Sequence, residues 1–399
     1  MKEMITANPL GYLSEQLESW RTAGSYQHLR VLESACDPVS RFDGHDVINL
    51  ASNNYLGLAD HPKLIEAQVA AAKKFGAGSG AVRTISGTMS IHMQLEERIA
   101  DFKQTEACVV FQSGFVANSG TVSAILGPED HIISDALNHA SIIDGCRLSK
   151  AKIHVFPHKD TAHAAAILQE LEGSSGHKLL ITDGVFSMDG DIGPLPALVE
   201  LAERHGAIMM IDDAHSSGVL GRKGRGTVDH FGLHGRVDVQ VGTLSKAIGV
   251  LGGYVCGSRD LIDFLYHRAR PFLFSTSHPP AVAAACLAAF DILENEPERI
   301  DKLWENTRYF KSALTQAGFN TGDSETPITP VLVGEARTAH AFSAALFEQG
   351  LLATGIGFPT VPEGKARIRT IVTATHTREM LDRALEILTG VAKKMGILG

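Results

Sequence analysis

The sequence of 399 residues predicts an α/β protein with a large domain, in which helices sandwich a mostly parallel sheet, and a smaller C-terminal α+β domain. Three observations predict this fold. Apolar runs of strand length recur from about residue 51, and helical patterns separate most of them. These runs lack strict alternation of apolar and polar residues, as is typical of strands buried on both faces. After about residue 291 the pattern changes to longer helices with short strands.

Residues 1–50 are expected to form an N-terminal arm with small strands. An amphipathic helix is predicted by four apolar residues at helical spacing, Leu10, Leu13, Leu17 and Trp20. A short strand pair is expected around Asp43-Gly44. The first ten residues contain no apolar stretch followed by a small-residue cleavage site, so we expect no secretory signal.

Residues 51–290 are expected to form the large domain. Its predicted strands are Ala107–Phe111, His131–Ser134, Lys152–Phe156, Leu179–Thr182, Ala207–Asp212, Val237–Gly242 and Gly253–Cys256. Helical patterns between them include Ala162–Leu171 and Leu195–Arg204. The apolar run Ala281–Phe290 follows Pro279-Pro280, a favourable helix start, and is too short to span a membrane. This run therefore predicts a helix of the core.

Residues 291–399 are expected to form the small C-terminal α+β domain, completed by the N-terminal arm. Its predicted helices are Ile300–Ala317, Thr338–Gln349 and Arg378–Met395, and its predicted strands are Ile328–Val333 and Ala366–Thr373. No internal repeat or low-complexity linker separates the two domains, so the boundary rests on the change of pattern.

Charge and cysteine content exclude several classes of protein. The formal net charge of −9 argues against general binding to nucleic acid or to an anionic membrane surface. The five cysteines are scattered and form no CxxC pair, which is typical of free thiols in a reducing cytoplasm. We therefore expect a cytoplasmic protein that binds neither nucleic acid nor membranes.

Polar side chains follow five of the predicted strands at the point where each strand ends. In a parallel sheet, ligands gather at the carboxyl ends of the strands, which share one edge. The residues found there are Ser113-Gly114-Phe115, Asn138-His139, Ser187, His215 and Lys246. The sequence therefore predicts a binding site at this edge.

Lys246 follows a buried strand, and Gly242, Ala247 and Gly249 around it predict tight backbone packing. A partly desolvated lysine amine has a lowered pKa and is the usual nucleophile towards the aldehyde of pyridoxal phosphate (PLP). Thr243 and Ser245 offer hydroxyls to the phosphate of that cofactor. The plainer alternative is a surface lysine after a strand.

Asp212 ends an apolar run, so its carboxylate is expected to be buried and to need a partner. The protonated pyridine nitrogen of PLP would be such a partner, and the pair would keep the ring an electron sink. The alternative is a helix N-cap, for which Asp213 is equally suited. His215 could hydrogen-bond the phenolic oxygen of the same ring, or it could be a capping or packing histidine.

Gly114 and Phe115 lie where a strand turns into a helix, and backbone N–H groups there could hold a phosphate. His139 could stack on an aromatic ring, or it could face solvent. The segment Gly221–Gly226 resembles a glycine-rich phosphate loop. Because it lacks the lysine–hydroxyl pair of that motif, we expect an ordinary flexible loop.

Two readings from other classes stay open. Asp212, Asp213 and His215 have the ligand chemistry of a metal-dependent hydrolase, but no second cluster with matching spacing accompanies them, so we expect no metal. A catalytically inactive partner subunit is the other reading, and the presence of Lys246 argues against it.

Five ordered motifs resemble one known family over nearly the whole chain. They are Asn53-Asn54-Tyr55-Leu56-Gly57-Leu58, Gly184–Gly190, Asp212-Asp213-Ala214-His215, Gly242–Lys246 and Ala366-Arg367-Ile368-Arg369. In these motifs the sequence is similar to the α-oxoamine synthases, PLP-dependent acyltransferases of the aspartate-aminotransferase fold type, fold type I. The resemblance implies condensation of an amino acid with an acyl-CoA and release of CoA.

The resemblance also implies roles for the candidate residues around the cofactor. Lys246 would bind PLP covalently and then act as the base at the substrate Cα. His139 would stack on the ring, Asp212 would pair with its nitrogen and His215 with its phenolic oxygen. The remaining cofactor contacts would come from Ser187, Gly114, Phe115 and Thr243, with Ser275 and Thr276 reaching over from a second subunit.

On the substrate side, Arg369 would bind the carboxylate of the amino acid, a task suited to a bidentate guanidinium. Asn53 and Thr360 would line the side of the amino acid and the acyl-CoA. Because two subunits share the site, the resemblance implies an obligate homodimer.

The branch within the family is predicted from three segments, Tyr26–Ala35, Arg270–Ser275 and Lys393–Leu398. They resemble glycine C-acetyltransferase (2-amino-3-ketobutyrate CoA ligase), which joins glycine to acetyl-CoA in threonine breakdown. The alternative is 8-amino-7-oxononanoate synthase of biotin synthesis, which uses L-alanine and pimeloyl-CoA or its carrier-protein thioester, and a bifunctional enzyme is also open. The arginine that biotin-type enzymes present to the pimeloyl carboxylate has no assigned counterpart, although Arg21 and Arg30 are nearby.

Overall fold

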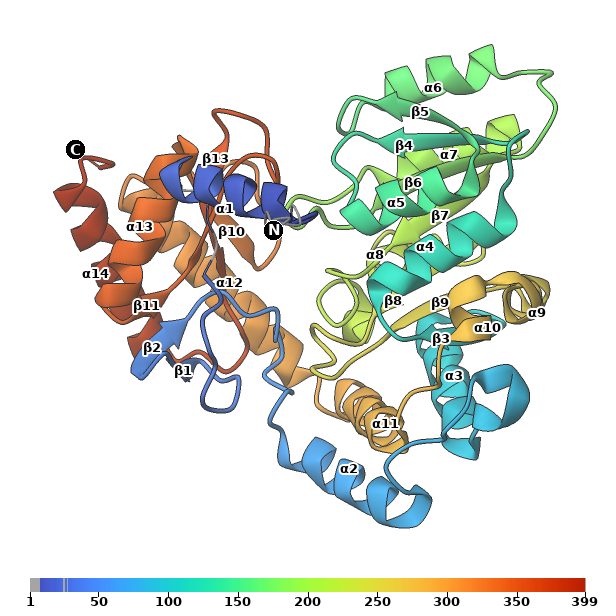
Figure 1. Ribbon diagram of the computed structural model, residues 1–399, viewed down its shortest axis with the longest axis horizontal. Helices are drawn as coiled ribbons and strands as arrows, with labels where there is room; N and C mark the ends of the chain where they lie inside the picture. Colours follow the sequence, from blue (N-terminus) through green and yellow to red (C-terminus); the bar gives the residue numbers. More distant parts are fainter. Residues whose placement is uncertain (1–7, 24–25, 27, 399) are drawn as a thin grey trace, which may run out of the picture.

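The main sheet of the protein has seven strands, which helices cover on both faces (Figure 1). The computed structural model describes residues 8–23, 26 and 28–398. The strand order is β3 (Ala107–Phe111), β9 (Gly253–Gly257), β8 (Val239–Thr243), β7 (Ile208–Asp212), β6 (Lys178–Asp183), β4 (His131–Asp135) and β5 (Lys152–Phe156). Strands β8, β7, β6, β4 and β5 pair in parallel, and β9 runs antiparallel to both of its neighbours. The prediction of a mostly parallel sheet is confirmed.

Both faces of this sheet are buried, which explains why its strands read as continuous apolar runs. Val109, Ile181 and Val241 pack on one face under α4 and α5, whereas Ile133 and Ile211 pack on the other. The helices and short helical turns of this lobe are α2 (Pro62–Phe75), η1 (Arg83–Gly87), α3 (Ser90–Lys103), α4 (Gly114–Ile125), α5 (Ala140–Ser149), α6 (Thr161–Glu170), α7 (Leu195–His205), η2 (Arg222–Gly224), α8 (Thr227–His230), α9 (Arg259–Arg268), α10 (Arg270–Phe274) and α11 (Pro280–Asn295). The predicted core helix after Pro279 is α11, and Cys286 and most of its alanine side chains are buried.

A second lobe contains two three-stranded sheets beside three long helices (Figure 1). One sheet has the antiparallel order β10 (Ile328–Gly334), β13 (Ala366–Ile371) and β12 (Thr354–Ile356), and the other has the order β1 (Val39–Phe42), β2 (His45–Asn49) and β11 (Leu351–Leu352). The helices are α12 (Glu298–Gln316), α13 (Ala336–Glu348) and α14 (Arg378–Lys394). Because β2 pairs in parallel with β11, the N-terminal strands are part of this lobe. Sequence patterns missed β11 and β12, since two or three residues are too few to show a period.

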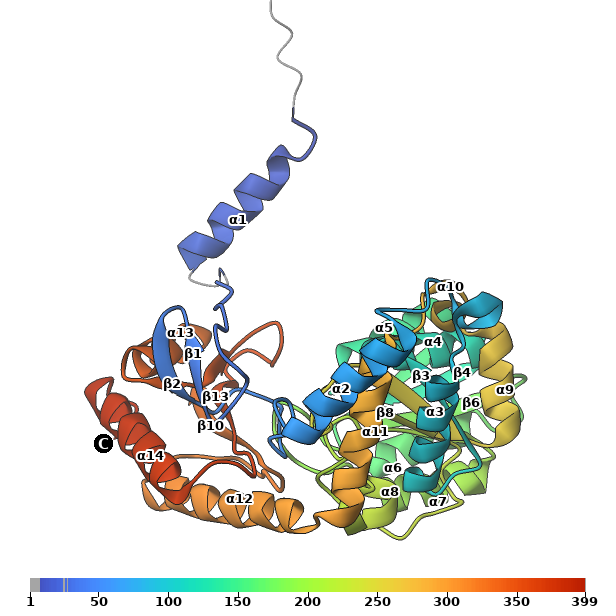
Figure 2. The ribbon, with the colours of Figure 1, turned by 90° about the horizontal axis from the view of Figure 1, so that it is seen from below.

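The predicted N-terminal helix is α1 (Gly11–Ala23), which projects away from both lobes (Figure 2). Leu10 lies in the turn before it, and Tyr12, Leu13 and Trp20 are exposed. The segment before residue 8, where no secretory signal was expected, lies outside the described residues. In the part of the chain that is described, no helix is long and apolar enough to cross a membrane.

Candidate active site

The carboxyl ends of β3, β4, β6, β7 and β8 surround one cavity of about 180 Å³. It is lined by Ser113, Gly114, Phe115, His139, Ser141, Asp183, Ser187, Asp212, Ala214, His215, Thr243, Ser245 and Lys246. The prediction that polar groups from five strand ends meet at one edge is therefore confirmed. These groups meet because parallel pairing brings the carboxyl ends of the strands to the same edge of the sheet.

Lys246 lies just after β8 in a tightly packed turn. The backbone of Gly249 donates a hydrogen bond to the carbonyl of Lys246 at 2.9 Å, and Gly249 has a φ of +77°. A Cβ atom at Gly249 would lie 2.8 Å from the backbone nitrogen of Ala59, so only glycine fits there. Burial lowers the pKa of the Lys246 amine to about 8, although the negative charges of Asp212 and Asp183 oppose this shift. The amine is therefore a better nucleophile near neutral pH than an exposed lysine.

This lowered pKa predicts the pH dependence of the amine's reactivity. In the protein stripped of cofactor, reductive methylation of Lys246 by formaldehyde should rise with pH through a midpoint of about 8. Only the neutral amine attacks a carbonyl, and burial disfavours the ammonium form, so the neutral amine is present at lower pH than in an exposed lysine. Peptide mass spectrometry across pH would measure this, with a free model compound, Nα-acetyl-lysine amide, as the reference. A midpoint for Lys246 equal to that of the model compound would contradict the prediction.

Asp212 and Asp213 point in opposite directions. The Asp212 carboxylate lines the cavity, where Oδ2 accepts from Asn118 Nδ2 at 2.6 Å and Oδ1 from the backbone N–H of Ala214 at 2.8 Å. Asp213 faces the interior instead and pairs with Lys103 at 2.7 Å, with both side chains completely buried. Turns rather than a helix follow the two residues, so the helix N-cap alternative is wrong for both.

The metal-hydrolase reading required Asp212, Asp213 and His215 to share one site. Besides the Lys103 ion pair, the Asp213 carboxylate accepts hydrogen bonds from the Ser216 hydroxyl and from the hydroxyl and backbone N–H of Thr227. Because these donors occupy Asp213, the three residues do not form a common set of ligands. That alternative is wrong for a geometric reason.

Two histidines line the cavity, and both have lowered pKa values. Burial holds the pKa of His215 well below its usual range, and the positive charges of Lys246 and Arg369 act in the same direction. Burial also lowers the pKa of His139, with Lys246 adding to the effect and Asp212 opposing it. His139 caps the N-terminus of α5, where its Nδ1 accepts from the backbone N–H of Ser141. Both imidazoles are therefore neutral near pH 7.

The first turn of α4 faces the same cavity and has the features of a phosphate site. Ser113 caps this twelve-residue helix by accepting from the N–H of Val116, and a Cβ atom at Gly114 would lie only 3.3 Å from Thr243 Cβ. The hydroxyls of Thr243 and Ser245 are 2.8 Å apart beside it. A helix N-terminus and hydroxyl donors bind anions well. Together with the buried amine and carboxylate, these groups fit PLP.

Arg369, on β13 of the second lobe, reaches towards this cavity. Its Nε donates to the carbonyl of Ser187 at 2.6 Å, and its second guanidinium nitrogen donates to Asn53 Oδ1 at 3.3 Å. Its positive charge contributes to the lowered pKa of both Lys246 and His215. The structure thus brings three of the predicted residues together, Arg369, Ser187 and Asn53.

Besides Asn53 and Arg369, three further predicted residues do not line the Lys246 cavity. Thr360 lines a separate cavity of about 880 Å³ together with Leu17, Trp20 and Phe358. Ser275 and Thr276 follow α10 outside the lining of the Lys246 cavity, and Thr276 forms a β-bridge with Val82. The roles expected for these three residues stay predictions.

Sequence reasoning missed Asp183, Asn118 and Ser141. Asp183 ends β6 as Asp212 ends β7, and this parallel position could have revealed it. Its Oδ2 accepts from the backbone N–H of His139 at 2.7 Å, and burial raises its pKa well above the usual range, with the charge of Asp212 adding to the effect. Asn118 and Ser141 lie within helices and carry no such signal.

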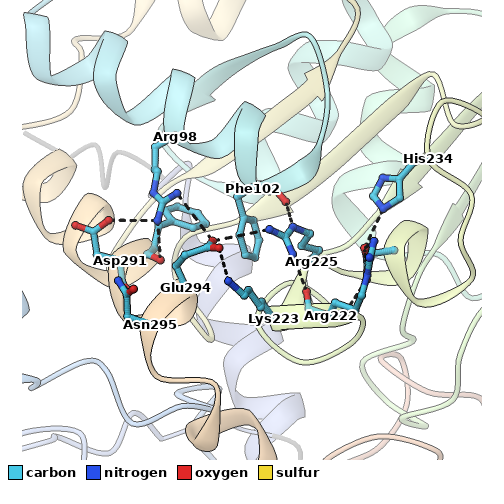
Figure 3. Close-up of polar contacts among 11 residues, drawn as sticks. Arg98, Phe102, Arg222, Lys223, Arg225, His234, Asp291, Glu294 and Asn295 are labelled. Atoms are coloured by element: carbon cyan, nitrogen blue, oxygen red, sulfur yellow. Dashed lines mark hydrogen bonds and ion pairs between the residues drawn. The ribbon is translucent and has the colours of Figure 1, made fainter.

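The segment Gly221–Gly226 was expected to be a flexible loop, but its basic side chains are paired (Figure 3). Lys223 pairs with Glu294 of α11, and Arg225 Nε donates to the carbonyl of Phe102 at 2.9 Å. The Lys103 amine donates to the carbonyl of Arg225 at 2.6 Å. The segment therefore contributes to the anchorage of the Lys103–Asp213 pair and does not form a phosphate site.

Comparisons with known proteins agree with this site. Residues 45–388 match the family model described as aminotransferase class I and II. The chain is 62% identical over 387 residues to the 8-amino-7-oxononanoate synthase of Symbiobacterium thermophilum, covering 97% of this chain and 99% of that protein. It is 55% identical over 395 residues to the 8-amino-7-oxononanoate synthase of Thermoanaerobacter pseudethanolicus, covering 99% and 100%.

Among solved structures, serine palmitoyltransferase of S. paucimobilis with a bound PLP–myriocin aldimine superposes with a TM-score of 0.93 at 31% identity, covering 98% of this chain and 100% of that one. The fold and the site thus define a PLP-dependent transferase of fold type I. The chain belongs to the aminotransferase class I and II family and, within it, to the α-oxoamine synthases, which are PLP-dependent acyltransferases.

The comparisons correct the predicted branch. The relatives just described are 8-amino-7-oxononanoate synthases, so glycine C-acetyltransferase and a place in threonine breakdown are not supported. The preference rested on three short segments, and none of their described residues lines the Lys246 cavity. Sequence identity over the whole chain is better evidence for the branch, and it favours the alternative, 8-amino-7-oxononanoate synthase.

Proposed function

We propose that this protein is an 8-amino-7-oxononanoate synthase of biotin synthesis. It would join L-alanine to the acyl group of pimeloyl-CoA, or of the pimeloyl carrier-protein thioester, and release the thiol and carbon dioxide. The observation that carries the proposal is 62% identity to a synthase of that name over 97% of this chain. The geometry of the Lys246 cavity supports the chemistry that such a condensation needs.

In this proposal the cofactor is held by groups that line the cavity. Gly114, Phe115 and Thr243 would hold the phosphate, and Ser187 would be a further contact. Asp212 would pair with the ring nitrogen, while His139 and His215 would contact the face of the ring and its phenolic oxygen. When bound, PLP supplies an electron sink for the charge that develops at the substrate Cα.

Lys246 and Arg369 would act on the amino acid itself. Two of the five N–H groups of Arg369 are used by Ser187 and Asn53, which leaves three to bind the carboxylate of alanine. With the carboxylate held, the neutral amine of Lys246 would take the proton from Cα. Positioning of this kind can contribute about 7–11 kcal/mol of barrier reduction in favourable cases.

The acyl side of the reaction is proposed for the larger cavity. Thr360 lines it with the apolar side chains of Leu17, Ile356 and Phe358, which suit a methylene chain. Its volume of about 880 Å³ exceeds what an acetyl group needs. This favours a pimeloyl over an acetyl donor.

We further propose a cytoplasmic homodimer in which Ser275 and Thr276 complete the partner's phosphate site. Phe115 at the rim of the cavity, Phe274 beside Ser275 and several apolar residues of α1 are exposed in the single chain, as expected of surfaces that a second subunit covers. Sedimentation of the purified protein at the mass of one chain would contradict this.

The choice of substrates is tested by one comparison. We expect kcat/KM for L-alanine with pimeloyl-CoA to exceed that for glycine with acetyl-CoA by at least about 10²-fold, because each methylene in an apolar pocket can contribute roughly tenfold or more. Thiol release would be measured for both pairs and for L-serine with palmitoyl-CoA. A higher value for either of the other pairs would contradict the proposal, and equal values for the first two would indicate the bifunctional enzyme instead.

A further inference from the structure

The two histidines of the cavity each have one ring nitrogen that the protein itself occupies. A neutral imidazole carries its proton on one nitrogen and accepts at the other, and the partner of one nitrogen decides which is which. Burial lowers the pKa of both His139 and His215, so both are neutral. The hydrogen-bond partners at Nδ1 therefore decide whether each Nε2 is a donor or an acceptor.

For His139 the partner is Ser141, through two of its groups. The backbone N–H of Ser141, which can only donate, lies 3.2 Å from Nδ1, and the Ser141 hydroxyl lies 2.7 Å from it. Because the backbone N–H can only donate, Nδ1 must be an acceptor, and the hydroxyl, which accepts from Asn118 Nδ2 at 2.9 Å, donates its own proton to the same nitrogen. With two donors at Nδ1, the imidazole proton lies on Nε2.

The direction of these hydrogen bonds starts at the Asp212 carboxylate. Asn118 is completely buried, and its Nδ2 donates to Asp212 at 2.6 Å as well as to Ser141. A flipped amide would place Asn118 Oδ1 against the carboxylate, two acceptors in contact, which is unfavourable. The carboxylate thus fixes the orientation of the Asn118 amide, whose hydrogen bond to the Ser141 hydroxyl leaves the hydroxyl proton for His139 Nδ1.

For His215 the partner is Tyr55, whose side chain is completely buried. Its hydroxyl lies 2.7 Å from His215 Nδ1, and among the described residues it has no other hydrogen-bond partner. A buried hydroxyl proton needs an acceptor, so the phenol donates to Nδ1 and the imidazole proton again lies on Nε2. Burial raises the pKa of Tyr55, which keeps the phenol protonated for this role.

We propose that Ser141 and Tyr55 are positioning residues that hold His139 and His215 as Nε2–H tautomers, so that both imidazoles offer a donor and neither offers a base. This extends the roles of the two histidines in the proposed function. A donor at Nε2 of His215 suits a phenolic oxygen that carries negative charge. It also leaves Lys246 as the base of the cavity.

The test is imidazole nitrogen NMR on the full-length protein labelled with ¹⁵N-histidine, stripped of PLP and again after loading. His139→Gln and His215→Gln assign the two residues. We expect both to show an unprotonated Nδ1 and a protonated Nε2 in each state. A protonated Nδ1 in either residue of the unsubstituted protein would overturn the proposal for that residue.

Two variants serve as controls for each other. Ser141→Ala removes the hydroxyl but keeps the backbone N–H at Nδ1, so it should shift His139 only partly towards the Nδ1–H tautomer and leave His215 unchanged. Tyr55→Phe should shift His215 towards the Nδ1–H tautomer and leave His139 unchanged. Ser141→Thr keeps the hydroxyl and should restore the His139 signal.

We also expect Tyr55→Phe to weaken PLP binding by about 3- to 10-fold, as loss of one neutral hydrogen bond does. If each variant shifted both histidines alike, a general loosening of the cavity would be the cause and the proposal would fail. No acyl substrate is used, so the result does not depend on which substrate pair the enzyme prefers.

Discussion

Replacement of Lys246 by alanine should abolish covalent attachment of the cofactor and reduce kcat by at least about 10³-fold, since a positioned general base alone contributes about 10²–10⁴-fold. The amine lies in the cavity with its pKa lowered to about 8, and Asp212 and Asp183 line the same cavity. None of the other cavity residues carries a primary amine. After borohydride treatment, mass spectrometry should find no pyridoxyl mass on the peptide that contains position 246.

Lys246→Arg is the matched control for this prediction. Arginine keeps a positive charge at the same place but is not a nucleophile at accessible pH. We expect it to fold and to remain inactive, which separates loss of chemistry from loss of charge. Substantial turnover by either variant would show that Lys246 is not the base.

Replacement of Asp212 by asparagine should lower kcat/KM by about 10²-fold to several thousand-fold, because loss of one partner of a buried charge pair costs about 3–5 kcal/mol. The substitution keeps the shape of the side chain, and Oδ1 can still accept from the backbone of Ala214. It removes the negative charge that we propose to pair with the cofactor nitrogen, and the Asn118 amide, which donates to Asp212 Oδ2, would flip to match the new amide group. The cofactor's absorbance and its dissociation constant would be measured beside the kinetics.

Asp213→Asn provides the contrast at the neighbouring position. This carboxylate pairs with the completely buried Lys103, so its loss leaves a buried ammonium without a counter-charge. We expect a marked fall in thermal stability for Asp213→Asn and little change for Asp212→Asn. If Asp212→Asn unfolded the protein and Asp213→Asn removed only activity, the two carboxylates would have been assigned the wrong way round.

The parts of the site that could be predicted from sequence are those at strand ends. Lys246, Asp212 and His215 each follow an apolar run, and parallel pairing then brings them to one edge whatever the loops do. Asn118, Ser141 and Tyr55 could not be predicted in this way. Their contacts depend on how α4, α5 and the segment after β2 pack against the sheet, and no local pattern encodes that packing.

The substrate branch was harder to predict for a different reason. The three segments used for it are short, while the specificity of a pocket depends on volume and on contacts from several elements. Thr360 illustrates this, since it lines a cavity together with residues of α1 and of β12. The sequence pattern did not predict β12. The cavity that they form is a property of the folded chain.

The two hydrogen bonds of Arg369 join three distant stretches of the chain, because the residue stands on β13, Ser187 follows β6 and Asn53 precedes α2. The guanidinium therefore belongs to the second lobe, while the amine of Lys246 belongs to the main sheet. A substrate carboxylate that binds between the guanidinium and the amine would connect the two lobes. Binding of the amino acid would then also restrict movement of one lobe against the other, so that the two effects would be coupled in free energy.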